Sequence, residues 1–230
     1  MHNGPYKKLQ EHSSNNSTLL VCSDIFGINP ALQAFFKDWR GELRLLSPYT
    51  KQQHFSDDEK AYQYFQQQGG LDSYRQKLRQ ILQQLAIAQQ TKPQKVIAVG
   101  FSAGAAALWC ELGCGPAHKL DGEPEQKLTS SAAAKRQTAM IQQAFCFYGG
   151  QIRHFAELNP GCQTELIWAQ ERHFDVKALA KALSGKANVS SRHCAYSHGF
   201  INPKSGGYHK QGAAYYQRWL MSKLLGGKAA

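Results

Sequence analysis

The feature that most constrains the fold is a short apolar segment at 96–99, which runs into the sequence G-F-S-A-G at 100–104. The segment is rich in β-branched residues, as buried strands are, and an alanine-rich helix-forming stretch follows the pentapeptide directly. A G-x-S-x-G sequence between a strand and a helix is typical of a tight turn that projects the serine hydroxyl beyond the strand end. We therefore expect Ser102 on a nucleophile elbow. The alternative is an ordinary strand-to-helix turn with a capping serine.

Strand and helix patterns alternate along the rest of the chain. Further buried strands are expected at 18–22, 43–46, 144–148, 165–169 and 189–196. Amphipathic helices are expected at 32–39, 56–68, 71–90, 176–183 and 210–225. This alternation indicates the α/β class, with a mostly parallel central sheet covered by helices on both faces.

The length of 230 residues fits a single domain with a sizeable core. We expect a polar N-terminal segment at 1–16, in which residues 6–9 are a candidate edge strand, followed by one domain over 17–226. A polar stretch at 113–137 lacks apolar periodicity and is too long for an ordinary connection. It is therefore expected to be an excursion on the surface or a flap.

The composition argues against several classes of partner. The formal net charge of +11 comes from 27 lysines and arginines against 16 acidic residues, and the basic residues are spread over the whole chain. Without a nucleic-acid-binding motif, this distribution indicates a solvated basic surface, and no nucleic-acid partner is expected. No apolar segment approaches the length of a membrane span, and the N-terminus lacks the apolar core of a secretory signal. We therefore expect no membrane partner and a cytoplasmic location.

The six cysteines are scattered through apolar segments, which indicates buried free thiols. Cys110 and Cys114 lie four positions apart on an expected helix, so they would share one face. No second pair of ligands stands at a spacing typical of zinc sites, and no metal site is expected.

Three candidate catalytic residues follow expected strands in the order serine, acid, histidine, which is the chain order of α/β-hydrolases. Ser102 ends one strand, and His198 follows the last strand. An imidazole next to a serine can take its proton, and a carboxylate can fix the tautomer of that imidazole. The acid is either Glu171, two residues past its strand, or Asp175, which stands directly before a helix and is also a candidate N-cap. Glu171 is slightly preferred, and both stay open.

Acyl transfer also requires donors for the oxyanion. The amide of Ala103, the residue after the serine, is one candidate. The other donor is expected from the loop after an earlier strand, and we select the amide of Ile25 in the loop at 24–27. The alternative is that this loop is only a tight turn.

The chain resembles the dienelactone hydrolase family of α/β-hydrolases. The matching sequences are D-I-F-G-I-N at 24–29, G-F-S-A-G at 100–104, F-Y-G at 147–149, H-F at 173–174 and H-G-F at 198–200. The resemblance implies a small single-domain hydrolase, without cofactor or metal, that opens esters or lactones through an acyl-enzyme. It also implies that Asp24, where the family has a glutamate, accepts a hydrogen bond from the resting nucleophile or helps to order the oxyanion loop.

Three departures from the family pattern limit this resemblance. The chain has Ser102 where the named enzymes of the family have a cysteine. The family's acid aligns with Arg172 when residues 173–174 serve as the anchor, so the acid function falls to Glu171 or Asp175. The arginine that binds a substrate carboxylate in the family corresponds to Asn202.

The sequence therefore predicts a serine hydrolase of the dienelactone hydrolase type. Its expected partner is a small ester or lactone, and the chain is expected to be a monomer or a small homo-oligomer. The alternative is a non-catalytic binding protein of the same fold, which Arg172 at the aligned acid position favours.

Overall fold

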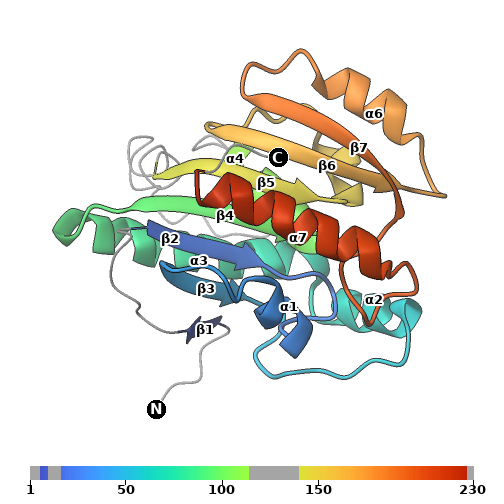
Figure 1. Cartoon of the computed structure of the whole chain (residues 1–230), viewed down its shortest axis with the longest axis horizontal. Helices are drawn as coiled ribbons and strands as arrows, with labels where there is room; N and C mark the ends of the chain where they lie inside the picture. The colour runs from blue at the N-terminus through green and yellow to red at the C-terminus, as the bar shows by residue number, and fades with distance from the viewer. Residues whose placement is uncertain (1–5, 10–16, 114–139, 227–230) are drawn as a thin grey trace.

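The computed structural model describes residues 6–9, 17–113 and 140–226. A seven-stranded sheet with the order β1-β3-β2-β4-β5-β6-β7 forms its centre (Figure 1). The strands are β1 (Tyr6–Leu9), β2 (Ser17–Cys22), β3 (Glu42–Leu46), β4 (Lys95–Phe101), β5 (Ile141–Phe147), β6 (Gln163–Gln170) and β7 (Val189–Ser197). Only β1 and β3 pair antiparallel, and the other neighbours are parallel. The expected α/β class is confirmed.

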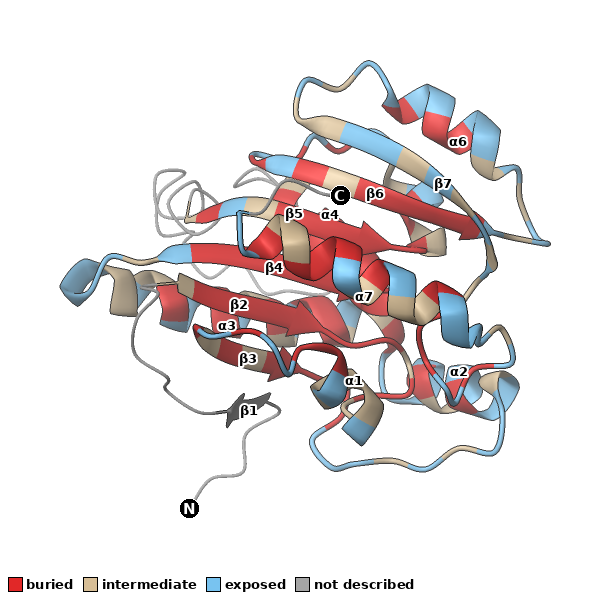
Figure 2. Cartoon of the chain, viewed as in Figure 1, coloured by how far each residue is buried: buried red, intermediate tan, exposed pale blue. Residues whose placement is uncertain are grey.

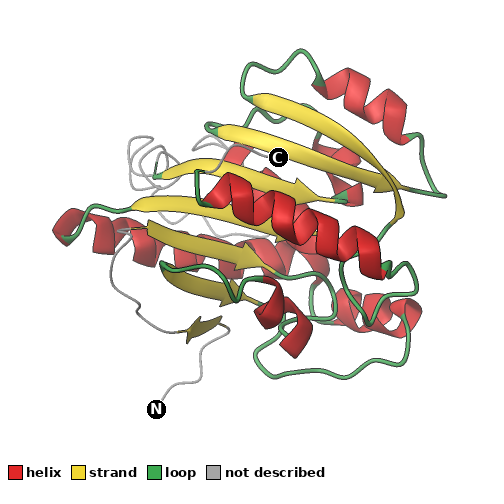
Figure 3. Ribbon diagram, in the orientation of Figure 1, coloured by secondary structure: helices red, strands yellow, loops and turns green. Residues whose placement is uncertain are grey.

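Helices cover both faces of the sheet (Figures 1 and 3). One face carries α1 (Pro30–Phe35) and α7 (Lys210–Leu224). The opposite face carries α2 (Asp58–Gln67), α3 (Gly70–Thr91), α4 (Ala103–Gly113) and α6 (Val176–Leu183). A short 3₁₀ helix, η1 (Gly150–Phe155), follows β5 and was not expected from the sequence.

The central strands divide the core into two clusters, because successive side chains of a strand point to opposite faces. On β4, Ile97 and Val99 pack with α1 and α7, whereas Val96 and Ala98 pack with α3 and α4. All four side chains are at most 1% exposed. Figure 2 shows the same burial along the middle of the sheet, which explains why these strands read as continuous apolar segments.

The first helix is shorter than its apolar spacing predicts. It ends at Phe35, and a turn follows, although the pattern continues to Trp39. Trp39 is nevertheless buried in the same cluster, and its indole nitrogen donates to the carbonyl of Glu42 at 3.1 Å. The apolar spacing therefore predicts the burial of Trp39 correctly but overestimates the length of the helix.

Two expected segments lie mainly outside the described residues. The polar stretch at 113–137 is described only at Gly113, and the N-terminal segment only at 6–9, where the candidate edge strand is confirmed as β1. In the parallel part of the sheet, the loops after the strands leave from one edge. This edge brings the candidate site residues together.

Candidate active site

Ser102 lies in the turn between β4 and α4. Its φ of 51° is in the left-handed region, which residues other than glycine rarely adopt and which stores strain at functional sites. Its amide donates to the carbonyl of Phe147 at 2.9 Å, and its carbonyl accepts from the amide of Ala106 at 3.1 Å. The turn is thus fixed to the neighbouring strand on one side and to the helix on the other.

Close packing requires both glycines of the G-x-S-x-G sequence. A Cβ atom on Gly104 would lie 2.4 Å from the carbonyl oxygens of Cys22 and Ser23, at the end of β2. A Cβ atom on Gly100 would lie 2.5 Å from the Cα atom of Ala105. Neither position has room for a larger residue unless the helix moves away from the sheet.

Ser102, His198 and Glu171 form a continuous chain of hydrogen bonds. The Oγ atom of Ser102 lies 2.8 Å from Nε2 of His198, and Nδ1 of His198 lies 2.6 Å from Oε1 of Glu171. The side chain of His198 is 37% exposed and that of Glu171 only 10% exposed. A carboxylate on Nδ1 favours the tautomer whose Nε2 accepts the serine proton. The three side chains thus lie in hydrogen-bonding order, serine to histidine to acid.

Neighbouring strands position the histidine and the acid. Glu171 directly follows β6, and His198 directly follows β7. The amide of His198 donates to the carbonyl of Gln170 at 3.2 Å, which joins the two strand ends. The ring of Tyr148 packs against the imidazole with 5.1 Å between the ring centroids. The relative positions of His198 and Glu171 are therefore set by the ends of two neighbouring strands and not by a long loop.

Asp175, the other acid considered from the sequence, lies elsewhere. It is the N-cap of α6, and its Oδ1 atom accepts from the amides of Lys177 and Ala178 at 2.8 and 3.0 Å. Within the described part of the chain, no hydrogen bond joins it to His198. The geometry brings Glu171 to the histidine and leaves Asp175 as a helix cap.

The resemblance does not select the carboxylate that lies at the histidine. It pairs the family's acid with Arg172, whose side chain is exposed. The carboxylate that contacts His198 belongs to the preceding residue, Glu171. The neighbouring H-F sequence therefore does not identify this carboxylate.

The loop after β2 carries Ile25 and is fixed at two points. The carbonyl of Ile25 accepts from the hydroxyl of Tyr49 at 2.7 Å, and the amide of Phe26 donates to Oδ1 of Asp24 at 2.9 Å. Ala103 is the first residue of α4, and amides in the first turn of a helix have no partner within the helix. Both residues selected as oxyanion donors thus lie at the sheet edge where Ser102 lies.

Asp24 is buried, and each of its carboxylate oxygens accepts a hydrogen bond. Oδ1 accepts from the amide of Phe26, and Oδ2 accepts from the side-chain nitrogen of Asn202 at 2.7 Å. Burial raises the pKa of Asp24 from its ordinary 3.8 to about 6, although both hydrogen bonds and the nearby His198 act in the opposite direction. The resemblance implies that Asp24 either accepts a hydrogen bond from the resting nucleophile or orders the oxyanion loop. Its contacts with Phe26 and Asn202 are those expected of the second role.

The contact between Asp24 and Asn202 was not foreseen from the sequence. It joins the loop after β2 to the loop that follows His198, across 178 residues of chain. The same histidine loop is held at Asp58, the first residue of α2, which accepts from the hydroxyl of Ser205 at 2.7 Å. No local pattern signals such a pair, because the two loops follow strands that are not neighbours in the sheet.

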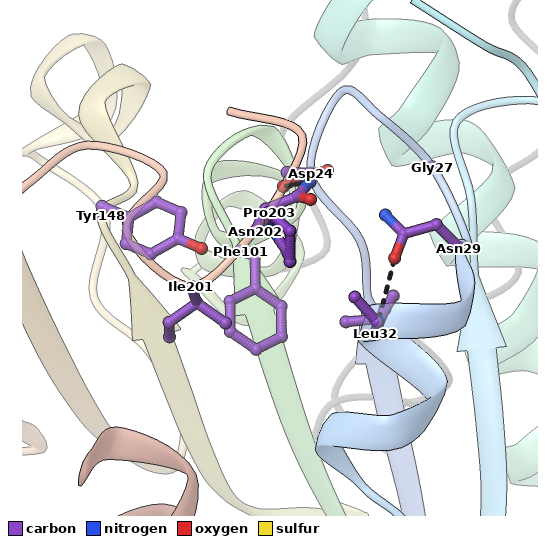
Figure 4. A pocket seen from close by; sticks show the side chains of 10 residues that line it. Asp24, Gly27, Asn29, Leu32, Phe101, Tyr148, Ile201, Asn202 and Pro203 are labelled. Carbon is purple, nitrogen blue, oxygen red and sulfur yellow. Dashed lines mark hydrogen bonds between the residues drawn. The ribbon is translucent and has the colours of Figure 1, made fainter. Parts of the chain in front are cut away.

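A small cavity lies between the start of α1 and the loops that follow β2, β5 and β7 (Figure 4). Its volume is about 20 Å³. Phe101, which precedes the serine, and Tyr148, which packs on the histidine, both line it. Asp24, from the loop after β2, and Asn202, from the loop after β7, also line it. The loop that carries Glu171 does not contribute to the lining.

Other centres are not evident in the described ranges. Among those residues, no group of three or more histidine, cysteine, aspartate or glutamate side chains is arranged to hold a metal ion. The described cysteines are free thiols, as expected. In the same ranges, no helix combines the length and the apolar character that crossing a membrane requires.

Comparison with known proteins gives structural similarity without sequence similarity. No family model and no curated protein matches the chain. The dienelactone hydrolase-like promiscuous phosphotriesterase P91 from metagenomic libraries has a TM-score of 0.55 and 17% identity, over 92% of this chain and 86% of its own. Dienelactone hydrolase from Anabaena variabilis has a TM-score of 0.55 and 14% identity, over 94% and 90%. Mouse alpha/beta hydrolase domain-containing protein 10 has a TM-score of 0.54 and 8% identity, over 95% and 92%.

The chain has the α/β-hydrolase fold. Within this fold the serine stands on the strand-to-helix elbow and the acid and the histidine follow later strands. Ser102, Glu171 and His198 occupy these places here, after β4, β6 and β7. The α/β-hydrolase fold hosts many activities, so the function must be argued from the site.

Proposed function

We propose that this α/β-hydrolase chain is a serine hydrolase that cleaves a small carboxylic ester or lactone through an acyl-enzyme intermediate. The observation that carries the proposal is the hydrogen-bonded chain from Ser102 through His198 to Glu171, with distances of 2.8 and 2.6 Å. A serine hydroxyl is barely ionised at neutral pH, and it becomes a nucleophile when a neighbouring base removes its proton.

In the acylation step, Nε2 of His198 takes the proton of Ser102 as Oγ attacks the carbonyl carbon of the substrate. Glu171 stabilises the imidazolium that forms. His198 then gives this proton to the leaving alcohol oxygen as the ester C–O bond breaks, and the acyl group remains on Ser102. In the second step His198 deprotonates a water molecule, the water oxygen attacks the acyl-enzyme, and the acid leaves with restoration of the serine.

The negative charge that develops on the carbonyl oxygen needs hydrogen-bond donors. We propose the amides of Ala103 and Ile25 for this role. The position of Ala103 at the start of α4 supports its part, because its amide has no partner within the helix. The contact between the Ile25 carbonyl and the Tyr49 hydroxyl supports the second donor, since it restricts the orientation of the loop.

The names of structurally similar proteins are compatible with this reaction type. They include a dienelactone hydrolase, esterase PE8 and an alpha-beta serine hydrolase homologue from Coxiella burnetii. The non-catalytic alternative was favoured by Arg172 at the aligned acid position. The contact of Glu171 with His198 supports the catalytic proposal instead.

The test is hydrolysis of short p-nitrophenyl esters by the wild type and by Ser102→Ala, with Ser190→Ala as the matched control. Ser190 is an exposed serine on β7. We expect Ser102→Ala to lower kcat/KM by at least about 10³-fold and Ser190→Ala to leave it unchanged. Both variants are checked for folding by circular dichroism. Turnover that survives Ser102→Ala unchanged would contradict the serine mechanism, and a wild type without turnover would favour the binding-protein alternative.

A further inference from the structure

Tyr148, the central residue of the F-Y-G sequence, has no role in the proposed mechanism and yet has a strained backbone. It follows β5 with a φ of 40°. Among the described residues other than glycine, only Ser102 and Tyr148 have a positive φ. Its amide donates to the carbonyl of Ile167 at 2.8 Å, which fixes this conformation to the neighbouring strand. Strain of this kind persists where the surrounding structure enforces it, and it concentrates at functional sites.

The hydroxyl of Tyr148 is directed into the small cavity of the candidate site (Figure 4). The residue is only 1% exposed, and its ring is held between His198 and Phe200 at centroid distances of 5.1 and 5.5 Å. No hydrogen bond to the hydroxyl is formed by any residue in the described ranges. The hydroxyl oxygen is accessible from the cavity and is free to bond to a polar group of a ligand that enters it.

Two further polar groups face the same space. The Oδ1 atom of Asn29 accepts from the amide of Leu32 at 2.9 Å, so its NH₂ group remains on the cavity side (Figure 4). The Asp24 carboxylate accepts one hydrogen bond at each oxygen and has capacity for two more. The cavity therefore presents donors from Tyr148 and Asn29 and an acceptor from Asp24.

The volume of the cavity suits a small polar group. A space of about 20 Å³ holds one group the size of a water molecule. A hydroxyl has this size and can accept from Tyr148 while it donates to Asp24. A carboxylate would be larger and would be repelled by the charge of Asp24, and a methyl group would leave the tyrosine hydroxyl without a partner.

We propose that Tyr148 is a specificity-determining residue whose side chain binds a hydroxyl substituent on the acyl part of the substrate. The preferred substrates are then short hydroxyacyl esters or the corresponding hydroxylated lactones. This inference rests on the proposed function, because only a hydrolase would turn over the bound ester as a substrate. The binding preference can be measured without catalysis.

The binding test therefore uses the Ser102→Ala variant, which keeps the cavity and cannot form the acyl-enzyme. The ligands are two isosteric pairs: ethyl 2-hydroxypropanoate with ethyl 2-methylpropanoate, and ethyl 3-hydroxybutanoate with ethyl 3-methylbutanoate. In at least one pair we expect the hydroxy ester to bind about tenfold more tightly in an NMR titration. Adding Tyr148→Phe should bring the ratio to about one, because the ring contacts stay and only the hydroxyl is lost.

Tyr216→Phe in the same background is the control, since Tyr216 is a buried tyrosine on α7 that does not line this cavity. It should leave the ratio unchanged. Equal affinities within both pairs, no measurable binding of either hydroxy ester, or a preference that survives Tyr148→Phe would overturn the inference. Turnover that is independent of Ser102 would instead contradict the proposed function, and the binding ratio would still decide the role of Tyr148.

Discussion

Two carboxylates at the carboxyl edge of the sheet have opposite surroundings. Glu171, after β6, contacts a ring nitrogen of His198, which in the proposed mechanism becomes a cation when it takes the serine proton. Asp24, after β2, is surrounded by neutral donors from Phe26 and Asn202, and burial raises its pKa to about 6. Under the proposed mechanism Glu171 therefore acts on the charge that develops on His198, whereas the contacts of Asp24 order the loops around it.

The largest expected effect is that of Glu171→Gln. The amide keeps the size of the side chain but cannot stabilise the imidazolium, so kcat on a short p-nitrophenyl ester should fall by about 10³- to 10⁴-fold. Asp175→Asn, in the same loop, should stay within about twofold of the wild type. Equal losses in the two variants would remove the distinction between a catalytic acid and a helix cap.

The second effect concerns stability and follows from the raised pKa of Asp24. Its carboxyl ionises near 3.8 in the unfolded chain and at about 6 in the folded one, so the folded state holds more protons between these values. The contribution of Asp24 to the free energy of unfolding should therefore fall by up to about 3 kcal/mol as the pH rises from below 3.8 to above 6.

Asp24→Asn removes this titration, so its stability relative to the wild type should improve by that amount over the same pH range. Urea unfolding of both proteins at about pH 4 and pH 7.5 gives the change in the free energy of unfolding between the two pH values for each protein. Comparing these two changes cancels any pH-independent cost of the new amide. A difference that does not change with pH would show that Asp24 is not penalised by its burial.

The smallest effect is that of Asp175→Ala. Loss of the N-cap bonds to Lys177 and Ala178 should lower the free energy of unfolding by about 1 kcal/mol, with activity unchanged. Asp38→Ala, at an exposed position outside the helices, should change it by less than about 0.5 kcal/mol. A loss of activity with Asp175→Ala would reopen the choice of acid.

The sequence was sufficient for the parts of the site that depend on local structure. The strand, the G-x-S-x-G turn and the following helix are all encoded within 95–113, and the geometry at Gly100 and Gly104 has the close packing that the small residues predict. His198 could be selected because a strand pattern ends directly before it.

Other parts of the site depend on contacts between distant segments. The bond between Asp24 and Asn202 forms because the loops after β2 and β7 meet above the sheet, and strand order cannot be read from the periodicity of single strands. The backbone strain at Tyr148 is enforced by the neighbouring strand and leaves no signal in residue type. The choice between Glu171 and Asp175 needed the orientation of one loop, because both carboxylates suit their positions in the sequence.

The most direct test of the central claim is mass spectrometry of the intact protein after rapid acid quench of a reaction with a short p-nitrophenyl ester. The account predicts that the wild type gains the mass of one acyl group, located by peptide mapping on Ser102, and that Ser102→Ala gains none. An acyl group located on another residue, or the same mass gain in Ser102→Ala, would contradict it.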